Sequence, residues 1–191
     1  FVTGLGRPNA LYVNDGTGSF RDGASAAGVE GPDWEVGYSG ALFGDVDGDG
    51  HPDLLVLSSE ETDDVLYLNR GDGTFTDATE QWGLEGAAHE PGGGGSATYS
   101  AVLEDWTGDG RLDLVVVQWF TDLLSLDSEA EEFGNGQGEG LCRRTDLLRR
   151  GEGVGAGAGA LRSRTRLYRN AGDRFEDVTA QSGVDAAARR L

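Results

Sequence analysis

Several residue types are scarce in this sequence, and each shortage excludes a class of protein. Cysteine occurs once, at Cys142, so the chain has neither an internal disulfide framework nor a cysteine-rich zinc site. Lysine is absent, and 34 acidic residues outnumber 15 arginines, which gives a formal net charge of -19. Such a chain repels a polyanion, so we expect no nucleic-acid partner. No apolar run approaches the roughly 20 residues of a membrane-spanning helix, so we expect no transmembrane segment.

Glycine, in contrast, is abundant, and much of it lies in a repeated pattern. The 33 glycines predict a turn-rich globular protein. A leucine followed by Tyr, an Asn/Gly turn and a Phe recurs, and each copy predicts two short strands around a turn that tolerates positive φ. The three copies lie at residues 11–22, 66–77 and 167–177.

An acidic segment between two apolar runs precedes the second and third copies, at residues 41–57 and 101–117. In both, the second run is almost continuously apolar, which suits a strand that is buried on both faces. Together with the hairpin pattern, each complete repeat therefore contains four strands, here called A to D. Four-stranded repeats of this length are typical of β-propeller blades.

The sequence thus predicts an all-β fold of four-stranded antiparallel propeller blades, about two and a half in number. We expect a half blade with strands C and D at 1–30, a full blade at 37–85 and another at 96–185. The last blade carries an insertion at about 121–163, which we interpret as a long surface loop. Because a closed propeller needs roughly four to eight blades, we expect the chain to be part of a longer protein or a larger assembly.

Each acidic segment places side-chain oxygens at loop positions 1, 3, 5 and 9. Ca²⁺ takes roughly six to eight oxygen ligands, and glycines let a loop curl so that alternate side chains point inward. Position 7 would contribute its backbone carbonyl. The predicted ligands of the two calcium sites are Asp45, Asp47, Asp49, the His51 carbonyl and Asp53, and then Asp105, Thr107, Asp109, the Arg111 carbonyl and Asp113.

Other interpretations of these loops fit less well. EF-hand and dockerin-like loops need a Glu at position 12, where this chain has Val56 and Val116. Mg²⁺ prefers a rigid octahedron, and transition metals prefer His and Cys ligands. Metal-free surface turns remain an alternative, although neighbouring carboxylates repel one another and a cation relieves that repulsion. Thr107 is neutral, so the second site should bind more weakly.

The sequence Phe43-Gly44-Asp45 and the acidic loop after it resemble the FG-GAP/VCBS repeats of integrin α-type propellers. The hairpin at 69–77 is similar to that of the cartilage acidic protein and UnbV/ASPIC group. The resemblance covers most of the chain outside 121–163, and the third copy departs from it because Leu103-Glu104 replaces Phe-Gly. It implies a calcium-stabilised propeller in a secreted, cell-surface or periplasmic protein, with faces that bind partners.

These observations favour a calcium-binding, non-enzymatic module for protein binding, adhesion or scaffolding. A lectin-like glycan-binding propeller, which exposed Trp side chains would indicate, is an alternative, as is a propeller-based enzyme acting on polysaccharide. The sequence shows no clustered acid/base pair outside the calcium loops, which weakens the enzyme hypothesis. Arg70-Gly71-Asp72 spells a tripeptide that integrins recognise, but the repeat itself places Gly and Asp in this turn.

Overall fold

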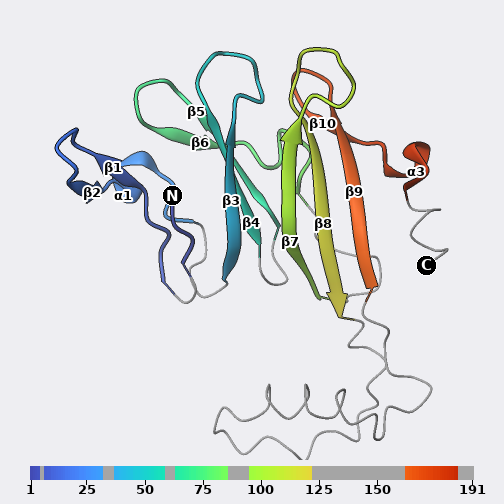
Figure 1. The fold of residues 1–191 in the computed structure, drawn as a ribbon, viewed down its shortest axis with the longest axis horizontal. Helices are drawn as coiled ribbons and strands as arrows, with labels where there is room; N and C mark the ends of the chain where they lie inside the picture. Colours follow the sequence, from blue (N-terminus) through green and yellow to red (C-terminus); the bar gives the residue numbers. More distant parts are fainter. Residues whose placement is uncertain (5–6, 32–36, 59–62, 86–94, 122–161, 185–191) are drawn as a thin grey trace, which may run out of the picture.

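A computed structural model of the chain describes residues 1–4, 7–31, 37–58, 63–85, 95–121 and 162–184. These residues form three antiparallel sheets that follow one another along the chain (Figure 1). The first sheet pairs β1 (Tyr12–Asn14) with β2 (Phe20–Asp22). The other two sheets have four strands each. The prediction of an all-β, partial-propeller fold built from four-stranded antiparallel sheets is therefore confirmed.

Within each four-stranded sheet, the strands pair in their order along the chain. The strands of the second sheet are β3 (Tyr38–Gly44), β4 (Asp53–Ser58), β5 (Val65–Asn69) and β6 (Phe75–Asp77). Those of the third sheet are β7 (Gly95–Glu104), β8 (Asp113–Thr121), β9 (Arg162–Asn170) and β10 (Phe175–Asp177). Two single-turn helices, α1 (Ala24–Ala27) and α3 (Thr179–Ser182), follow β2 and β10.

The first unit of the fold (residues 1–4 and 7–31) contains more than the predicted strands C and D. Val2 pairs with Ala10 in an antiparallel bridge, and the Gly4 amide donates to Asn9 Oδ1 at 2.8 Å. In the second sheet, the Ser58 amide donates to Asp64 Oδ1 at 2.8 Å in the same arrangement. The N-terminal segment thus takes the place that the end of β4 takes in the second sheet.

The ends of the expected insertion belong to the third sheet. The ladder between β8 and β9 continues to Phe120 and Arg162, so residues 121, 162 and 163 lie in strands. The remainder of the insertion, with Cys142, lies outside the described residues.

Two apolar clusters hold the sheets together, and β4 contributes to both because its side chains alternate between its two faces. Leu54 and Val56 pack with the first unit, where Val29 is also fully buried. Leu55 and Leu57 face the third sheet. The third sheet and the loops contribute Leu114, Val116, Tyr168, Phe175 and Trp82 to that second cluster. Burial on both faces explains the almost continuous apolar run in β4.

Candidate metal centre

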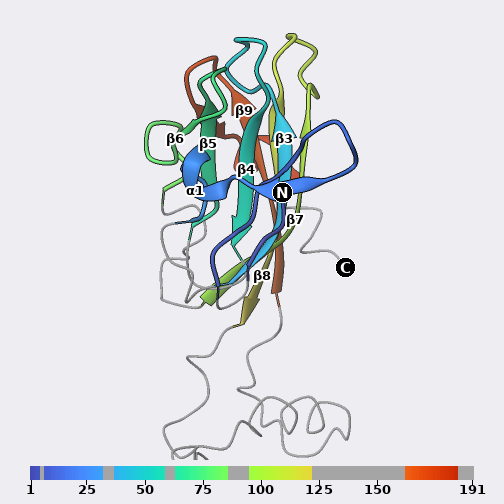
Figure 2. The same cartoon turned by 90° about the vertical axis from the view of Figure 1, so that its left-hand side faces the viewer.

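The two acidic loops lie at the same end of the molecule. The first loop (45–53) joins β3 to β4, and the second loop (105–113) joins β7 to β8. The β5–β6 and β9–β10 turns lie at this end as well, at the top of Figures 1 and 2. This arrangement follows from the antiparallel order of strands A to D, which brings every A–B loop and every C–D turn to one edge.

Asp45 curls the first loop around its own carboxylate. Its Oδ1 accepts a hydrogen bond from the Gly48 amide at 2.8 Å, and its Oδ2 accepts one from the Gly50 amide at 2.9 Å. Gly48 and Gly50 have φ values of 78° and 88°, a left-handed conformation that glycine adopts without strain. Their positions in the sequence therefore set the curl of the loop.

The curl brings three of the predicted ligands together. One carboxylate oxygen from each of Asp45, Asp47 and Asp49 lies within 4.8 Å of the others. Burial raises the pKa of Asp47, and the negative charges of Asp49 and Asp45 raise it further. A cation placed among these oxygens would offset the repulsion between them. This group could hold a metal ion.

Asp53, the predicted ligand at position 9, has a different environment. It is 1% exposed, with Oδ1 accepting from the Asn69 amide and Oδ2 from the Val46 amide, both at 2.8 Å. Burial raises its pKa as well. Asp53 thus ties the loop to β5, and each of its oxygens keeps a second lone pair. The His51 amide donates to Asp49 Oδ1 at 2.8 Å, and the exposed His51 ring lies beside Gly71.

The second loop repeats the curl but gathers its oxygens less completely. Asp105 accepts hydrogen bonds from the amides of Gly110 at 2.8 Å and Gly108 at 2.7 Å, which hold its pKa below the usual value. The Arg111 guanidinium pairs with Asp109 Oδ2 at 2.5 Å, and a cation would have to compete with it. Among the described residues, the three-carboxylate group occurs in the first loop and not in the second.

Thr107 and Asp113 contact each other in the second loop. The Thr107 hydroxyl donates to Asp113 Oδ2 at 3.0 Å, and the fully buried Asp113 accepts the Asn170 amide on Oδ1 at 2.8 Å. Asp113 therefore ties its loop to β9 as Asp53 ties the first loop to β5. The carbonyl ligation predicted for His51 and Arg111 stays a prediction.

Sequence reasoning missed two asparagines beside the loops. Asn69 Nδ2 donates to the Pro52 carbonyl at 2.9 Å, and Asn170 Nδ2 donates to the Leu112 carbonyl at 3.0 Å. The recurrence of Asn at the same place in each hairpin was the available signal, but it was interpreted only as a turn preference.

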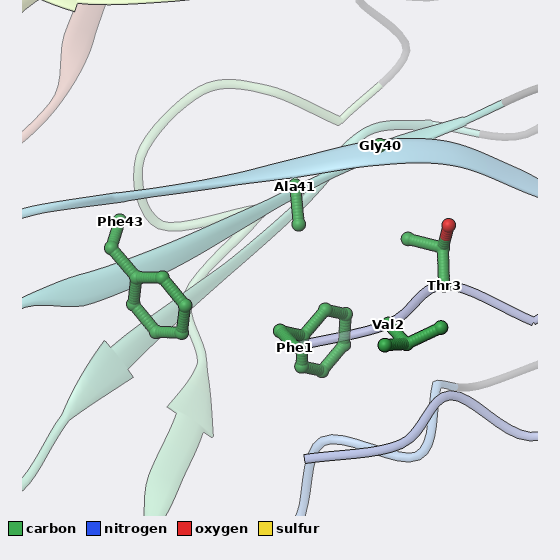
Figure 3. Close-up of a pocket in the computed structure, with 6 residues that line it drawn as sticks. All are labelled: Phe1, Val2, Thr3, Gly40, Ala41 and Phe43. Carbon is green, nitrogen blue, oxygen red and sulfur yellow. The ribbon is translucent and has the colours of Figure 1, made fainter. Parts of the chain in front are cut away.

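A separate shallow groove lies between the N-terminal segment and β3 (Figure 3). Its volume is about 440 Å³. It is lined by Phe1, Val2, Thr3, Gly40, Ala41 and Phe43. Because these side chains are apolar apart from one hydroxyl, the groove offers no counterpart to the oxygen chemistry of the loops.

Comparisons with known proteins agree with the repeated architecture. The sequence profile of the family described as FG-GAP-like repeat matches residues 1–56 and 45–116. These segments contain both acidic loops. Human cartilage acidic protein 1 is 31% identical over 112 residues. The aligned region covers 59% of this chain and 15% of that protein, so the chain spans a small part of the relative's length.

No helix in the described segments is long and apolar enough to cross a membrane.

The expected resemblance is confirmed, because the profile matches run from residue 1 to residue 116 of 191 and so cover more than half of the sequence. With its repeated four-stranded sheets and acidic loops, the chain belongs to the family of proteins built from FG-GAP-like repeats.

Proposed function

We propose that this chain is a calcium-binding, non-enzymatic propeller module that serves outside the cytoplasm in protein binding, adhesion or scaffolding. The observation that carries the proposal is the convergence of Asp45, Asp47 and Asp49 in a loop curled by its own backbone amides. Family membership and the similarity to a protein named for cartilage support an extracytoplasmic location and a role in protein interaction.

The chemistry of the first loop suits Ca²⁺. The ion is hard and prefers oxygen ligands in a flexible shell, and this loop offers carboxylates at positions 1, 3 and 5. Asp53 would complete the site from the buried side, with the His51 carbonyl at position 7. When bound, the ion would neutralise clustered negative charge and hold the loop in one conformation. The role is structural, since these carboxylates also organise backbone amides.

The second loop should bind Ca²⁺ more weakly than the first. Thr107 supplies a neutral oxygen, and the Arg111 guanidinium already neutralises part of the charge of Asp109. Fewer free negative charges lower the affinity of an oxygen site for the ion. We therefore expect two sites that fill at different calcium concentrations.

A calcium titration followed by thermal unfolding tests the proposal. The test variant carries Asp47→Asn and Asp49→Asn, which keep the oxygens that accept the Asp49 and His51 amides but remove two charges. The matched control carries Asp15→Asn and Asp72→Asn in the C–D turns, where each Asp accepts a backbone amide and a Thr hydroxyl two residues on. Both variants change the net charge equally.

Calcium at about 100 times the dissociation constant of the first loop should stabilise the unmodified protein by about 2.7 kcal/mol through that loop. The control should keep that response, and the test variant should lose the part that belongs to the first loop. An unmodified protein that does not respond to calcium, or two variants that respond alike, would contradict the proposal.

The nature of the partner can be tested separately. Trp106 lies in the second loop and is 40% exposed, which is the kind of side chain that a glycan-binding surface would use. We expect protein partners, so a glycan array probed in calcium should show no binding that Trp106→Ala removes. Glycan binding that depended on Trp106 would favour the lectin-like alternative.

A further inference from the structure

Asn170 is a buried amide with every polar atom in use. It is 0% exposed and ends β9. Its Oδ1 accepts a hydrogen bond from the Gly172 amide at 2.8 Å. Its Nδ2 donates to the carbonyl of Val46 at 2.7 Å and to the carbonyl of Leu112 at 3.0 Å. Because an amide nitrogen carries two hydrogens, these bonds exhaust its donors.

The two carbonyls belong to different acidic loops. Val46 lies between Asp45 and Asp47 in the first loop, and Leu112 immediately precedes Asp113 in the second. A single side chain of the third sheet therefore bonds to the backbone of both loops. The bond to Val46 joins residues that are 124 positions apart in the chain. Figure 1 shows the end of β9 at the same edge as both loops.

The peptide groups around Val46 are held from two sides. The Val46 amide donates to Asp53 Oδ2 at 2.8 Å, and its carbonyl accepts from Asn170. The Val46 side chain is buried in the cluster between the two four-stranded sheets. Since the orientation of this residue sets the directions of Asp45 and Asp47, Asn170 acts on the geometry of two predicted ligands without touching the ion.

Asn69 is the counterpart of Asn170 in the second sheet and serves as an internal comparison. It accepts the Gly71 amide at 2.9 Å and donates to the Pro52 carbonyl at 2.9 Å, as Asn170 does with Gly172 and Leu112. Within the described part of the chain, the hydrogen bonds of the Asn69 side chain stay inside its own sheet. The bond to a neighbouring loop distinguishes Asn170.

We propose that Asn170 is a positioning residue that holds Asp45 and Asp47 in their cation-binding geometry and couples cation occupancy of the first loop to that of the second. The inference rests on the proposed calcium function. A loop that is already ordered loses less conformational freedom when it binds an ion. Coupling between two binding sites is reciprocal, so each occupied loop favours occupancy of the other.

Site-specific calcium titrations by ¹H–¹⁵N NMR test this proposal. The amides of Gly48 and Gly50 report on the first loop, and those of Gly108 and Gly110 report on the second. Asn170→Ser keeps a short hydroxyl that can accept from the Gly172 amide but removes both donors. Asn69→Ser makes the matched change in the second sheet.

We expect Asn69→Ser to weaken calcium binding directly at the first loop, and at the second loop only through the coupling between them. Asn170→Ser removes the bond to Leu112 of the second loop and the bond to Val46 of the first loop. It should therefore weaken calcium binding at both loops, by about fivefold for each hydrogen bond lost. If Asn170→Ser left the calcium titrations of Gly48 and Gly50 unchanged, Asn170 would not position the first loop.

The first step of a second measurement needs no substitution of Asn170. Asp47→Asn with Asp49→Asn empties the first loop, and coupling predicts weaker binding at Gly108 and Gly110. The same pair in the Asn170→Ser background should have no further effect on the second loop, which completes a double-mutant cycle. An unchanged second loop in the first of these experiments would overturn the coupling, even if Asn170→Ser failed to fold.

Failure of the proposed function gives a different result. In that case, neither pair of glycine amides in the unmodified protein would respond to calcium, and the claim of coupled occupancy would fall with it. The positioning by Asn170 is then judged from amide hydrogen exchange in residues 46–50 of the metal-free protein. Faster exchange in Asn170→Ser than in Asn69→Ser would support positioning, and equal exchange would overturn it.

Discussion

The Asp64 carboxylate accepts a hydrogen bond from the Thr98 hydroxyl at 2.9 Å, and this bond crosses from the second sheet to the third. The other oxygen of Asp64 accepts the Ser58 amide at 2.8 Å, and the Ser39 hydroxyl donates to the Thr98 carbonyl at 2.5 Å. Burial raises the pKa of Asp64 to about 6, and the charge of Asp63 adds to this effect. The interface between the sheets thus contains a carboxyl group that keeps its proton up to about pH 6.

The raised pKa of Asp64 predicts a pH dependence of stability. The folded state holds the proton more tightly than the unfolded state, so the contribution of Asp64 is complete below about pH 4 and is lost as pH rises through about 6. A shift of this size corresponds to about 3 kcal/mol. Asp64→Asn mimics the neutral acid and should raise the free energy of unfolding at pH 7.5 but not at pH 4.

Urea unfolding of both proteins across about pH 4 to 7.5 in calcium-free buffer measures this difference. Glu80→Gln, which removes one exposed charge, serves as the control for a change in net charge. A difference between Asp64→Asn and the unmodified protein that stayed constant with pH would show that Asp64 titrates normally.

The close approach of the second and third sheets predicts a cost for Gly44→Ala. A Cβ at Gly44 would lie 2.9 Å from the Cδ1 atoms of both Leu103 and Leu112. These are the ends of flexible side chains, so we expect a loss of about 1 kcal/mol in the free energy of unfolding. Gly40→Ala in the same strand is the control, because its new Cβ would meet Leu57 Cδ1 at an ordinary 3.7 Å.

Chemical denaturation of both variants checks the prediction, and Leu103→Ala added to Gly44→Ala should recover part of the loss caused by crowding. Equal effects of the two glycine substitutions would place the cost in the strand backbone rather than in the contact between sheets.

Different roles are predicted for two carboxylates of the first loop. Both oxygens of Asp53 accept backbone amides, so Asp53→Asn turns an NH₂ group toward an N–H and should cost about 2 kcal/mol without calcium. Asp49→Asn keeps the acceptor for the His51 amide and should cost little until calcium is added. Thermal unfolding in chelator and then in calcium measures both. Similar losses for the two variants in chelator would contradict this division.

The core between the sheets predicts unequal effects for two tryptophans. Trp82 is 1% exposed, and its ring centroid lies 5.2 Å from that of Phe175 in the third sheet. Trp82→Ala should therefore cost about 3 to 5 kcal/mol. Trp106 is 40% exposed, so Trp106→Ala in calcium-free buffer should change the free energy of unfolding by less than about 0.5 kcal/mol. Urea unfolding of the two variants distinguishes these values, and comparable losses would contradict the assigned burial.

The sequence alone predicted the repeated strands and both acidic loops, because their determinants are local. The bonds from Asp45 to the amides of Gly48 and Gly50 span three and five residues, and the spacing of Asp and Gly sets them. The alternate burial of Leu54 and Leu55 likewise follows from the two-residue period of a strand. Such features need no information about the rest of the chain.

Other features depended on how distant segments pack. The side-chain pairing of Arg111 with Asp109 was not foreseen, because the sequence interpretation used only the Arg111 carbonyl. The sequence also gave no reason to separate Asp53, which is buried against backbone amides, from the exposed Asp49. Both differences depend on the next hairpin, because Arg111 Nε donates to the Asn170 carbonyl at 3.0 Å and Asp53 Oδ1 accepts the Asn69 amide.

The composition and spacing of the chain thus determined the blade pattern and the positions of its acidic oxygens. The tertiary structure alone decided that Asn170 would reach Val46, that Asp64 would meet Thr98, and that Gly44 would lie against the third sheet. These contacts join residues on different sheets. Their distances depend on the packing of Leu and Val side chains between the sheets, and a one-dimensional pattern does not encode that packing.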